Sequence, residues 1–330
     1  MLIRAFKSSF YAQYLLLIAL AAGLWVPRLF HTCSTVEVGR ESPLFSLIVG
    51  IAGPDSIVGI ILSFFLLLIT AWLFNFFLIR HEILPKNTLI GAIVFVILMS
   101  HPLVALGINP VLTSALIIVL AFDRMLNTYG KADPTQDVFS ATFLASLASL
   151  IYFPSAILFV LLLLSFMLFG NFSLRILMIA LSGIVAVYLY LLVIYFLNDD
   201  LEQQYSIYAE WIKTMPEAVF PLHWMIYTAY GMIILLFIAG LLYVFSHLNE
   251  WNISVRKKTL MSMYFALLSI LTLFYERDNL PVAILLAMIP ISVIIAAYLA
   301  GRRKNLFWLE VYVILLYCLS LVNNIFFSTC

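Results

Sequence analysis

The chain has 330 residues, of which 65% are hydrophobic and 10% are charged, and its mean hydropathy is +1.13. Soluble domains carry about 25% charged residues, so water could not solvate this chain and lipid must be its main environment. The net charge of +1 says little about partners, but the lack of a basic domain argues against nucleic acid as one.

Long apolar stretches follow one another along the whole sequence. A helix needs about 20 apolar residues to cross the roughly 30 Å of hydrocarbon in a bilayer, and lipid offers no other partner for backbone N–H and C=O groups. The candidate spans are Tyr11–Phe30, Ser56–Ile79, Thr88–Ala105, Val111–Leu126, Val138–Phe153, Pro154–Gly170, Leu174–Leu197, Trp224–Ser246, Thr259–Tyr275, Val282–Ala300 and Phe307–Phe327. We therefore predict an all-α fold, a polytopic transmembrane helical bundle of about 11 spans, which forms one integral membrane domain over residues 1–330.

Pro154 separates the fifth and sixth stretches. As one helix, residues 138–170 would extend over about 50 Å, which is too long for a single crossing. Pro154 lacks an N–H group and disfavours a helical conformation at the preceding residue, so it suits a tight hairpin. We expect the small residues Ala141, Ala145 and Ala148 to let the two arms of this hairpin approach closely.

The basic residues predict the orientation of the chain. With the hairpin and a cytoplasmic N-terminus, all of them lie inside except Arg28, Arg40, Lys213 and Arg277, as the positive-inside rule requires. We expect a bacterial plasma (inner) membrane, with the N-terminus cytoplasmic and the C-terminus extracytoplasmic. The first apolar run continues to Phe30, past a signal-like run of small residues, which favours an uncleaved anchor.

Two outer segments are predicted to be structured. Residues 42–53 begin with Ser-Pro and are too short to span, so they favour an interfacial or re-entrant helix. Residues 201–215 place aromatic and apolar side chains at helical spacing, which indicates an amphipathic helix on the outer surface. Cys33 and Cys330 fall on this same side, which permits a disulfide, although two free thiols are the simpler expectation.

Several motifs that mark enzymes and transporters are missing. The sequence has no Gly-rich phosphate loop, no His-Glu-x-x-His and no paired-cysteine metal site. The span centres lack ionisable residues, and Asp123 and Glu310 sit towards the cytoplasmic ends, so an ion-coupled transporter is disfavoured. The basic clusters 256–258 and 302–304 are explained by topology and also attract anionic lipid headgroups.

Polar residues gather instead at the outer ends of the predicted spans. Glu37 and Glu41 are candidate catalytic residues, since a carboxylate can act as a general base or hold a divalent cation. Arg40, His101 and Arg277 are candidates for binding substrate phosphate. The alternative is that the loop charges are solvated or locally paired and that His101 is a satisfied helix cap. The identity of any metal or cofactor stays open.

The arrangement resembles the GT-C glycosyltransferases, polytopic enzymes that use polyprenyl-phosphate sugars. The resemblance covers residues 1–221, with outer loops at 31–55 and 198–223, and residues 224–330 would add four further spans. Residues 141–154, ATFLASLASLIYFP, also resemble the small-residue helix ending in proline of that superfamily. The chain is similar, too, to uncharacterised bacterial families of polytopic membrane proteins.

The resemblance implies a catalytic carboxylate in the first outer loop. GT-C enzymes commonly have an aspartate there, close to the first helix. This chain has Glu37 and Glu41 at that place, and the one aspartate of the loop is the more distant Asp55. This departure puts catalysis in question.

Three functions follow as hypotheses. The first is a GT-C-like protein that acts on polyprenyl-linked sugars at the outer face. The alternative is a non-enzymatic membrane subunit or scaffold of an envelope complex, and a weaker alternative is a channel or carrier for a neutral solute. The expected partners are membrane lipids, a lipid-linked saccharide and other membrane proteins.

Overall fold

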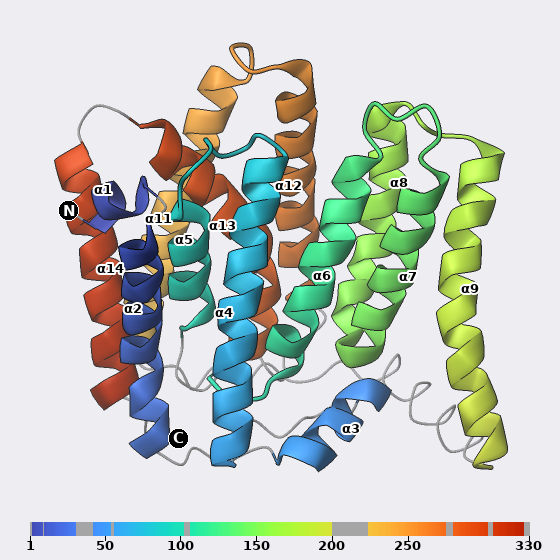
Figure 1. The fold of residues 1–330 in the computed structure, drawn as a ribbon, viewed down its shortest axis with the longest axis horizontal. Coiled ribbons are helices and arrows are strands. Elements are labelled where there is room, and N and C mark those ends of the chain that lie inside the picture. The colour runs from blue at the N-terminus through green and yellow to red at the C-terminus, as the bar shows by residue number, and fades with distance from the viewer. Residues whose placement is uncertain are drawn as a thin grey trace.

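The computed structural model describes residues 2–8, 10–30, 42–53, 56–101, 106–199, 224–274, 280–302 and 306–326. Every regular element in these ranges is a helix (Figure 1). In chain order they are α1 (Leu2–Phe6), α2 (Tyr11–Phe30), α3 (Pro43–Ala52), α4 (Ile57–Arg80), α5 (Ile90–Met99), α6 (Pro110–Asn127), α7 (Thr135–Ile151), the 3₁₀ helix η2 (Phe153–Ala156), α8 (Ile157–Phe169), α9 (Leu174–Leu197), α11 (Trp224–His247), α12 (Ile253–Thr272), α13 (Leu280–Gly301) and α14 (Leu306–Phe326).

The all-α prediction is confirmed, and each predicted stretch corresponds to its own helix. Within the described part of the chain, α2, α4, α6, α9, α11, α13 and α14 are long and apolar enough to cross a membrane. The protein is therefore an integral, multi-pass membrane protein. The helices α5, α7 and α8 are shorter, and α12 begins with the charged residues 256–258, so about 11 crossings stay a prediction.

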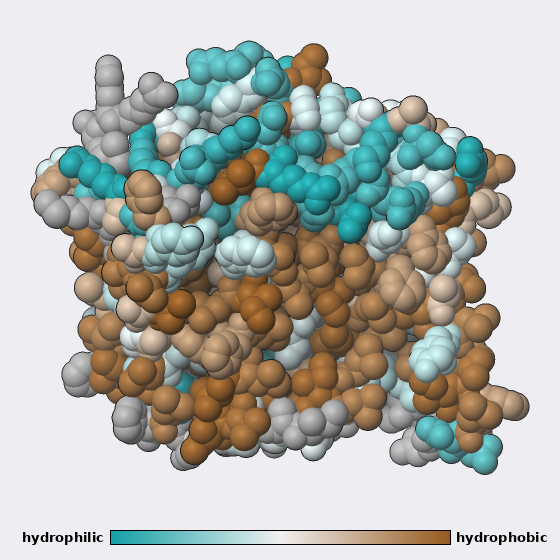
Figure 2. All heavy atoms as spheres, viewed as in Figure 1, coloured by the Kyte–Doolittle hydropathy of each residue, from teal (hydrophilic) through white to brown (hydrophobic). Residues whose placement is uncertain are grey.

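The two ends of the bundle differ in polarity. α1 and the connections 81–89, 128–134, 170–173 and 248–252 lie together at the upper end in Figure 1, which we call the basic end. Figure 2 shows hydrophilic side chains across this end and a broad hydrophobic surface below it. These are the connections that the charge pattern assigns to the cytoplasm, and that assignment itself stays a prediction.

The centre of the bundle is formed by α13 and α5. The share of α13 buried inside the protein is 94%, and it packs against α5, α6, α11 and α12. All ten residues of α5 are buried. At 1.5 Å per residue α5 is about 15 Å long, half of the hydrocarbon thickness, so the predicted full span Thr88–Ala105 is not one helix. Because α5 is enclosed by other helices, its ends need not meet lipid.

The predicted hairpin at Pro154 is present. α7 ends at Ile151, and η2 carries Pro154 and turns the chain into α8. Along its length, however, α7 packs mainly against α6 and α9 rather than α8, which contacts α12 instead. The predicted close approach of the two arms is therefore wrong. The reason is long-range packing, which the local run of alanines does not reveal.

The predicted short helix after residue 41 is also present. α3 starts after Ser42 with Pro43 in its first turn and ends at Gly53, whose φ is +69°. It lies crosswise below α6 and α7 (Figure 1), where Phe45 packs against Ile108 and Ile151. The predicted helix 201–215 and the cysteines Cys33 and Cys330 lie outside the described residues.

Candidate functional site

A buried arginine stands near the end of α2, on the side of the bundle away from the basic end. Arg28 is in the last turn of α2 and is only 3% exposed. It faces Gly107, where an added β-carbon would lie 3.9 Å from Arg28 Nε. A buried charge at membrane depth is costly and usually marks function.

One helical turn earlier, α2 is joined to α5 and α14 by hydrogen bonds. Trp25 Nε1 donates to Ser100 Oγ at 3.0 Å. Asn324 Nδ2 donates to the carbonyl oxygens of Leu24, at 3.1 Å, and Ser100, at 3.2 Å. These bonds fix the start of the last turn of α2, and thereby the position from which Arg28 extends.

Two polar side chains in this region have no hydrogen-bond partner among the described residues. His101 is 1% exposed, and neither ring nitrogen makes a hydrogen bond, although the Ile226 backbone is close by. Its ring meets Tyr230 of α11 edge-on, with centroids 5.3 Å apart. The buried Tyr230 hydroxyl also lacks a partner. Such groups cost about 1–3 kcal/mol each when they are left unsatisfied, so they call for water or a ligand.

We call Trp25, Arg28, Ser100, His101, Tyr230 and Asn324 the polar cluster. It draws on α2, the segment after α5, α11 and α14, and all six residues are buried. A guanidinium group has five N–H donors in a fork that fits phosphate or carboxylate oxygens. The imidazole of His101, next to Ser100, and the phenol of Tyr230 on α11 add further N–H and O–H groups. The cluster is therefore chemically suited to hold an anionic group.

Of the site residues predicted from the sequence, His101 is described and the others are not. Glu37, Glu41, Arg40 and Arg277 lie outside the described residues. The C-cap of α5 is Ser100, whose backbone N–H bonds to Val96 O, so His101 is the residue directly after the cap. The alternative that His101 is a satisfied residue at a helix end stays a prediction, because its ring lies close to the Ile226 backbone.

Sequence reasoning missed Arg28, Tyr230 and Asn324. Arg28 could have been noticed in the sequence, because it is a basic residue within an apolar stretch, on the side where the positive-inside rule predicts few basic residues. Tyr230 and Asn324 could not, since tyrosine and asparagine near span ends are ordinary at a membrane interface.

The charged residues of the basic end form local ion pairs. Asp123 accepts from Arg80 at 3.1 Å and lies 2.9 Å from His81 Nε2. Glu310 pairs with Arg4 at 3.5 Å. Asp123 and Glu310 thus both lie at the basic end, each paired with a basic residue, and the prediction that this end is cytoplasmic stays untested.

Metal-ligating side chains do not gather in the described part of the chain: no group of three or more His, Cys, Asp or Glu is found there. No protein family, curated protein or solved structure matches the sequence or the fold.

Proposed function

We propose that this multi-pass membrane protein binds the phosphate of a polyprenyl-linked saccharide at the polar cluster, as a GT-C-like protein acting at the outer face. The observation that carries the proposal is a buried arginine, Arg28, at the same end of the bundle as the buried imidazole of His101 and phenol of Tyr230. The two ring nitrogens of His101 and the hydroxyl of Tyr230 have no hydrogen-bond partner among the described residues. All three come from the half of the bundle opposite the basic end.

The physical setting supports an anionic, membrane-borne ligand. A guanidinium group and a phosphate attract each other far more strongly in a low-dielectric interior than in water. An isoprenoid chain would occupy the surrounding bilayer while its phosphate reached the cluster. A soluble anion would lack this apolar contribution to binding.

Transfer of the sugar is the finer part of the proposal, and it rests on the GT-C resemblance. Glu37 or Glu41 would accept the proton of the acceptor hydroxyl as its oxygen attacks the anomeric carbon of the sugar. The polyprenyl phosphate would leave with the bonding electron pair, held by Arg40 and Arg277, and a divalent cation could assist. Replacing Glu37 and Glu41 with Gln should abolish transfer without affecting phosphate binding.

Phosphate binding is tested first, on the purified full-length protein in detergent. Polyprenyl phosphate should raise the melting temperature more than polyprenol does, and Arg28→Gln should weaken phosphate binding about tenfold or more. Arg28→Lys, which keeps the charge, and Tyr230→Phe should have intermediate effects. The control is Arg175→Gln, because Arg175 is exposed at the basic end. Equal binding of polyprenol and polyprenyl phosphate would refute the proposal.

The second candidate function is a non-enzymatic subunit of an envelope complex. It is favoured by the sequence of the first outer loop, where the one aspartate is Asp55 rather than a residue close to the first helix. Co-purification with other membrane proteins at fixed stoichiometry, together with no sugar transfer by the isolated chain, would select it. A channel along the bundle axis is disfavoured, because α13 fills that position.

A further inference from the structure

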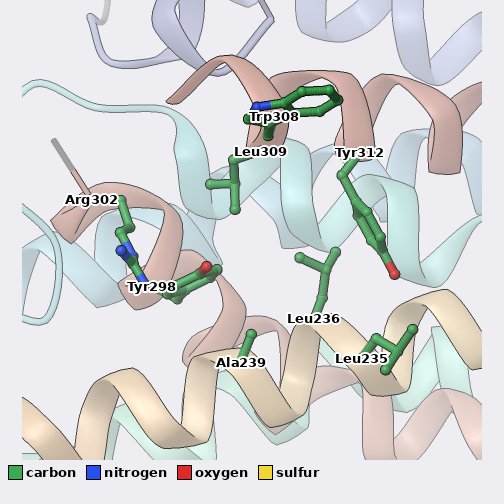
Figure 3. A pocket seen from close by; sticks show the side chains of 8 residues that line it. All are labelled: Leu235, Leu236, Ala239, Tyr298, Arg302, Trp308, Leu309 and Tyr312. Carbon is green, nitrogen blue, oxygen red and sulfur yellow. The ribbon is translucent and has the colours of Figure 1, made fainter. Parts of the chain in front are cut away.

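A groove opens on the side of the bundle between α11, α13 and α14. It has a volume of about 370 Å³ and begins at the basic end, whereas the polar cluster lies towards the other end of the bundle. Figure 3 shows side chains of all three helices directed into the same space. At its deeper part, the hydroxyl of Tyr312 on α14 donates to Met232 O on α11 at 2.9 Å, which joins the two walls.

The lining changes from polar to apolar along the groove. Arg302, at the end of α13, is exposed at the basic end, and its guanidinium carbon lies 5.4 Å from the centroid of the Tyr298 ring. Trp308, in the first turn of α14, also lines the groove. Tryptophan side chains favour the headgroup layer of a membrane. Further along, Leu235, Leu236 and Ala239 of α11 provide an apolar surface.

Charge distinguishes this groove from a neighbouring hollow near the same end. That hollow, of about 430 Å³, is lined by Glu82 and Glu250, so it would repel an anion. In the groove the charged lining residue is Arg302, and the ammonium group of Lys7 lies close by, since Lys7 Nζ donates to Arg302 O at 2.9 Å. The groove is thus complementary to a molecule with a negative head and an apolar tail.

We propose that this groove binds one anionic phospholipid from the leaflet at the basic end. Arg302 holds the headgroup phosphate, Trp308 lies against the glycerol region, and one acyl chain follows Leu235, Leu236 and Ala239 towards the middle of the bilayer. The site is independent of the polar cluster and of any activity there. The basic cluster 302–304 attracts anionic lipids in general. The groove would in addition hold one such lipid at a defined position.

Native mass spectrometry of the full-length protein with phosphatidylglycerol or phosphatidylcholine tests the headgroup. One phosphatidylglycerol should be retained in preference to phosphatidylcholine. Arg302→Gln should reduce this retention about fivefold, the effect of about 1 kcal/mol for one basic residue near the surface. Arg302→Lys should retain most of it. The matched control is Arg175→Gln, which removes an exposed arginine of the same end outside the groove.

The acyl-chain part is tested by filling the groove. Ala239→Phe should displace the retained lipid, whereas Leu242→Phe, an exposed position of the same helix outside the groove, should not. Equal losses for Arg302→Gln and Arg175→Gln would show diffuse attraction and overturn the proposal, as would equal retention of the two lipids. Retention unchanged by Ala239→Phe would also overturn it. Unchanged melting temperatures of the variants would establish that they are folded.

Discussion

His81 places an imidazole ring at the basic end, where α4 stops. The ring is buried, and Nε2 lies 2.9 Å from Asp123 Oδ1. Burial lowers the pKa of His81 from its ordinary value of 6.5, because the charged form is poorly solvated; Asp123 opposes this shift, and Lys258 and Arg80 add to it. The neutral ring, with Nε2–H donating to the carboxylate, is therefore the form that packs here.

This pKa predicts how stability depends on pH. The unfolded chain takes up a proton at His81 near pH 6.5, and the folded protein does so only at lower pH, so acidification favours unfolding. Between about pH 7.5 and pH 5.5 the melting temperature of the wild type should fall further than that of His81→Gln. Thermal unfolding in detergent at both pH values measures this. Parallel pH profiles for the two proteins would contradict it.

Arg28 shows what a single residue in the sequence does not reveal. Its position against the positive-inside rule could be noted from the sequence, but the turn of α2 just before it is held by α14, which follows about 300 residues later and bonds to Leu24 O through Asn324. The same holds for His101: the proline beside it predicts a helix end, whereas its edge-on contact with Tyr230 involves α11, which follows much later in the chain. Distant contacts, rather than local pattern, create the polar cluster.

At the scale of single helices, α7 and α9 pack closely because of a glycine. A β-carbon at Gly183 of α9 would overlap Thr142 Oγ1 and lie 3.1 Å from Phe139 O on α7. A further contact between these helices joins Ser149 Oγ and the Tyr188 hydroxyl at 2.7 Å. Small residues allow this kind of approach between membrane helices, where packing and hydrogen bonds drive association.

Gly183→Ala should therefore lower the melting temperature, because α9 must move away from α7. Gly231→Ala is the matched control, since no atom lies within 4 Å of its added carbon, and it should be neutral or stabilising by up to about 1 kcal/mol. In the Thr142→Ala background, Gly183→Ala should cost less, because the overlapping hydroxyl is gone. An equal cost in both backgrounds would show that this contact does not set the helix spacing.

Helix positions were predicted well, and helix neighbours were not. Hydropathy located the stretches, and Pro154 identified the turn between α7 and α8. Yet α4 and α13 have the same hydropathy, although 39% of the α4 span is buried inside the protein and 94% of the α13 span is. Lipid and protein interior select for the same side chains, so composition could not separate a lipid-facing helix from the central one. Composition likewise did not reveal that α5 is short and fully buried.

On the scale of the whole molecule, polarity is divided between two ends. Hydrophilic side chains cover the basic end (Figure 2), where several of the charged ones form ion pairs, while the polar cluster lies buried towards the other end. This division predicts that the two ends face opposite sides of a membrane, with the basic end in the cytoplasm.

Cysteine labelling tests this orientation in intact cells. After replacement of the native cysteines by serine, a cysteine at Asp199 should react with a membrane-impermeant maleimide, because Asp199 follows the far end of α9. A cysteine at Lys257, in the first turns of α12, should react only after the cells are permeabilised. Labelling of both from the same side would contradict the predicted topology.

The enclosure of α13 also constrains how the protein is made. The ribosome delivers α5, α6, α11 and α12 to the membrane before α13, although all four pack against it. Until residue 301 has emerged, these earlier helices lack the surface that joins them, and their inward faces must be occupied by lipid or by the insertion machinery. We therefore expect the helices to reach their final packing late, once α13 has been inserted, rather than step by step as each helix enters the membrane.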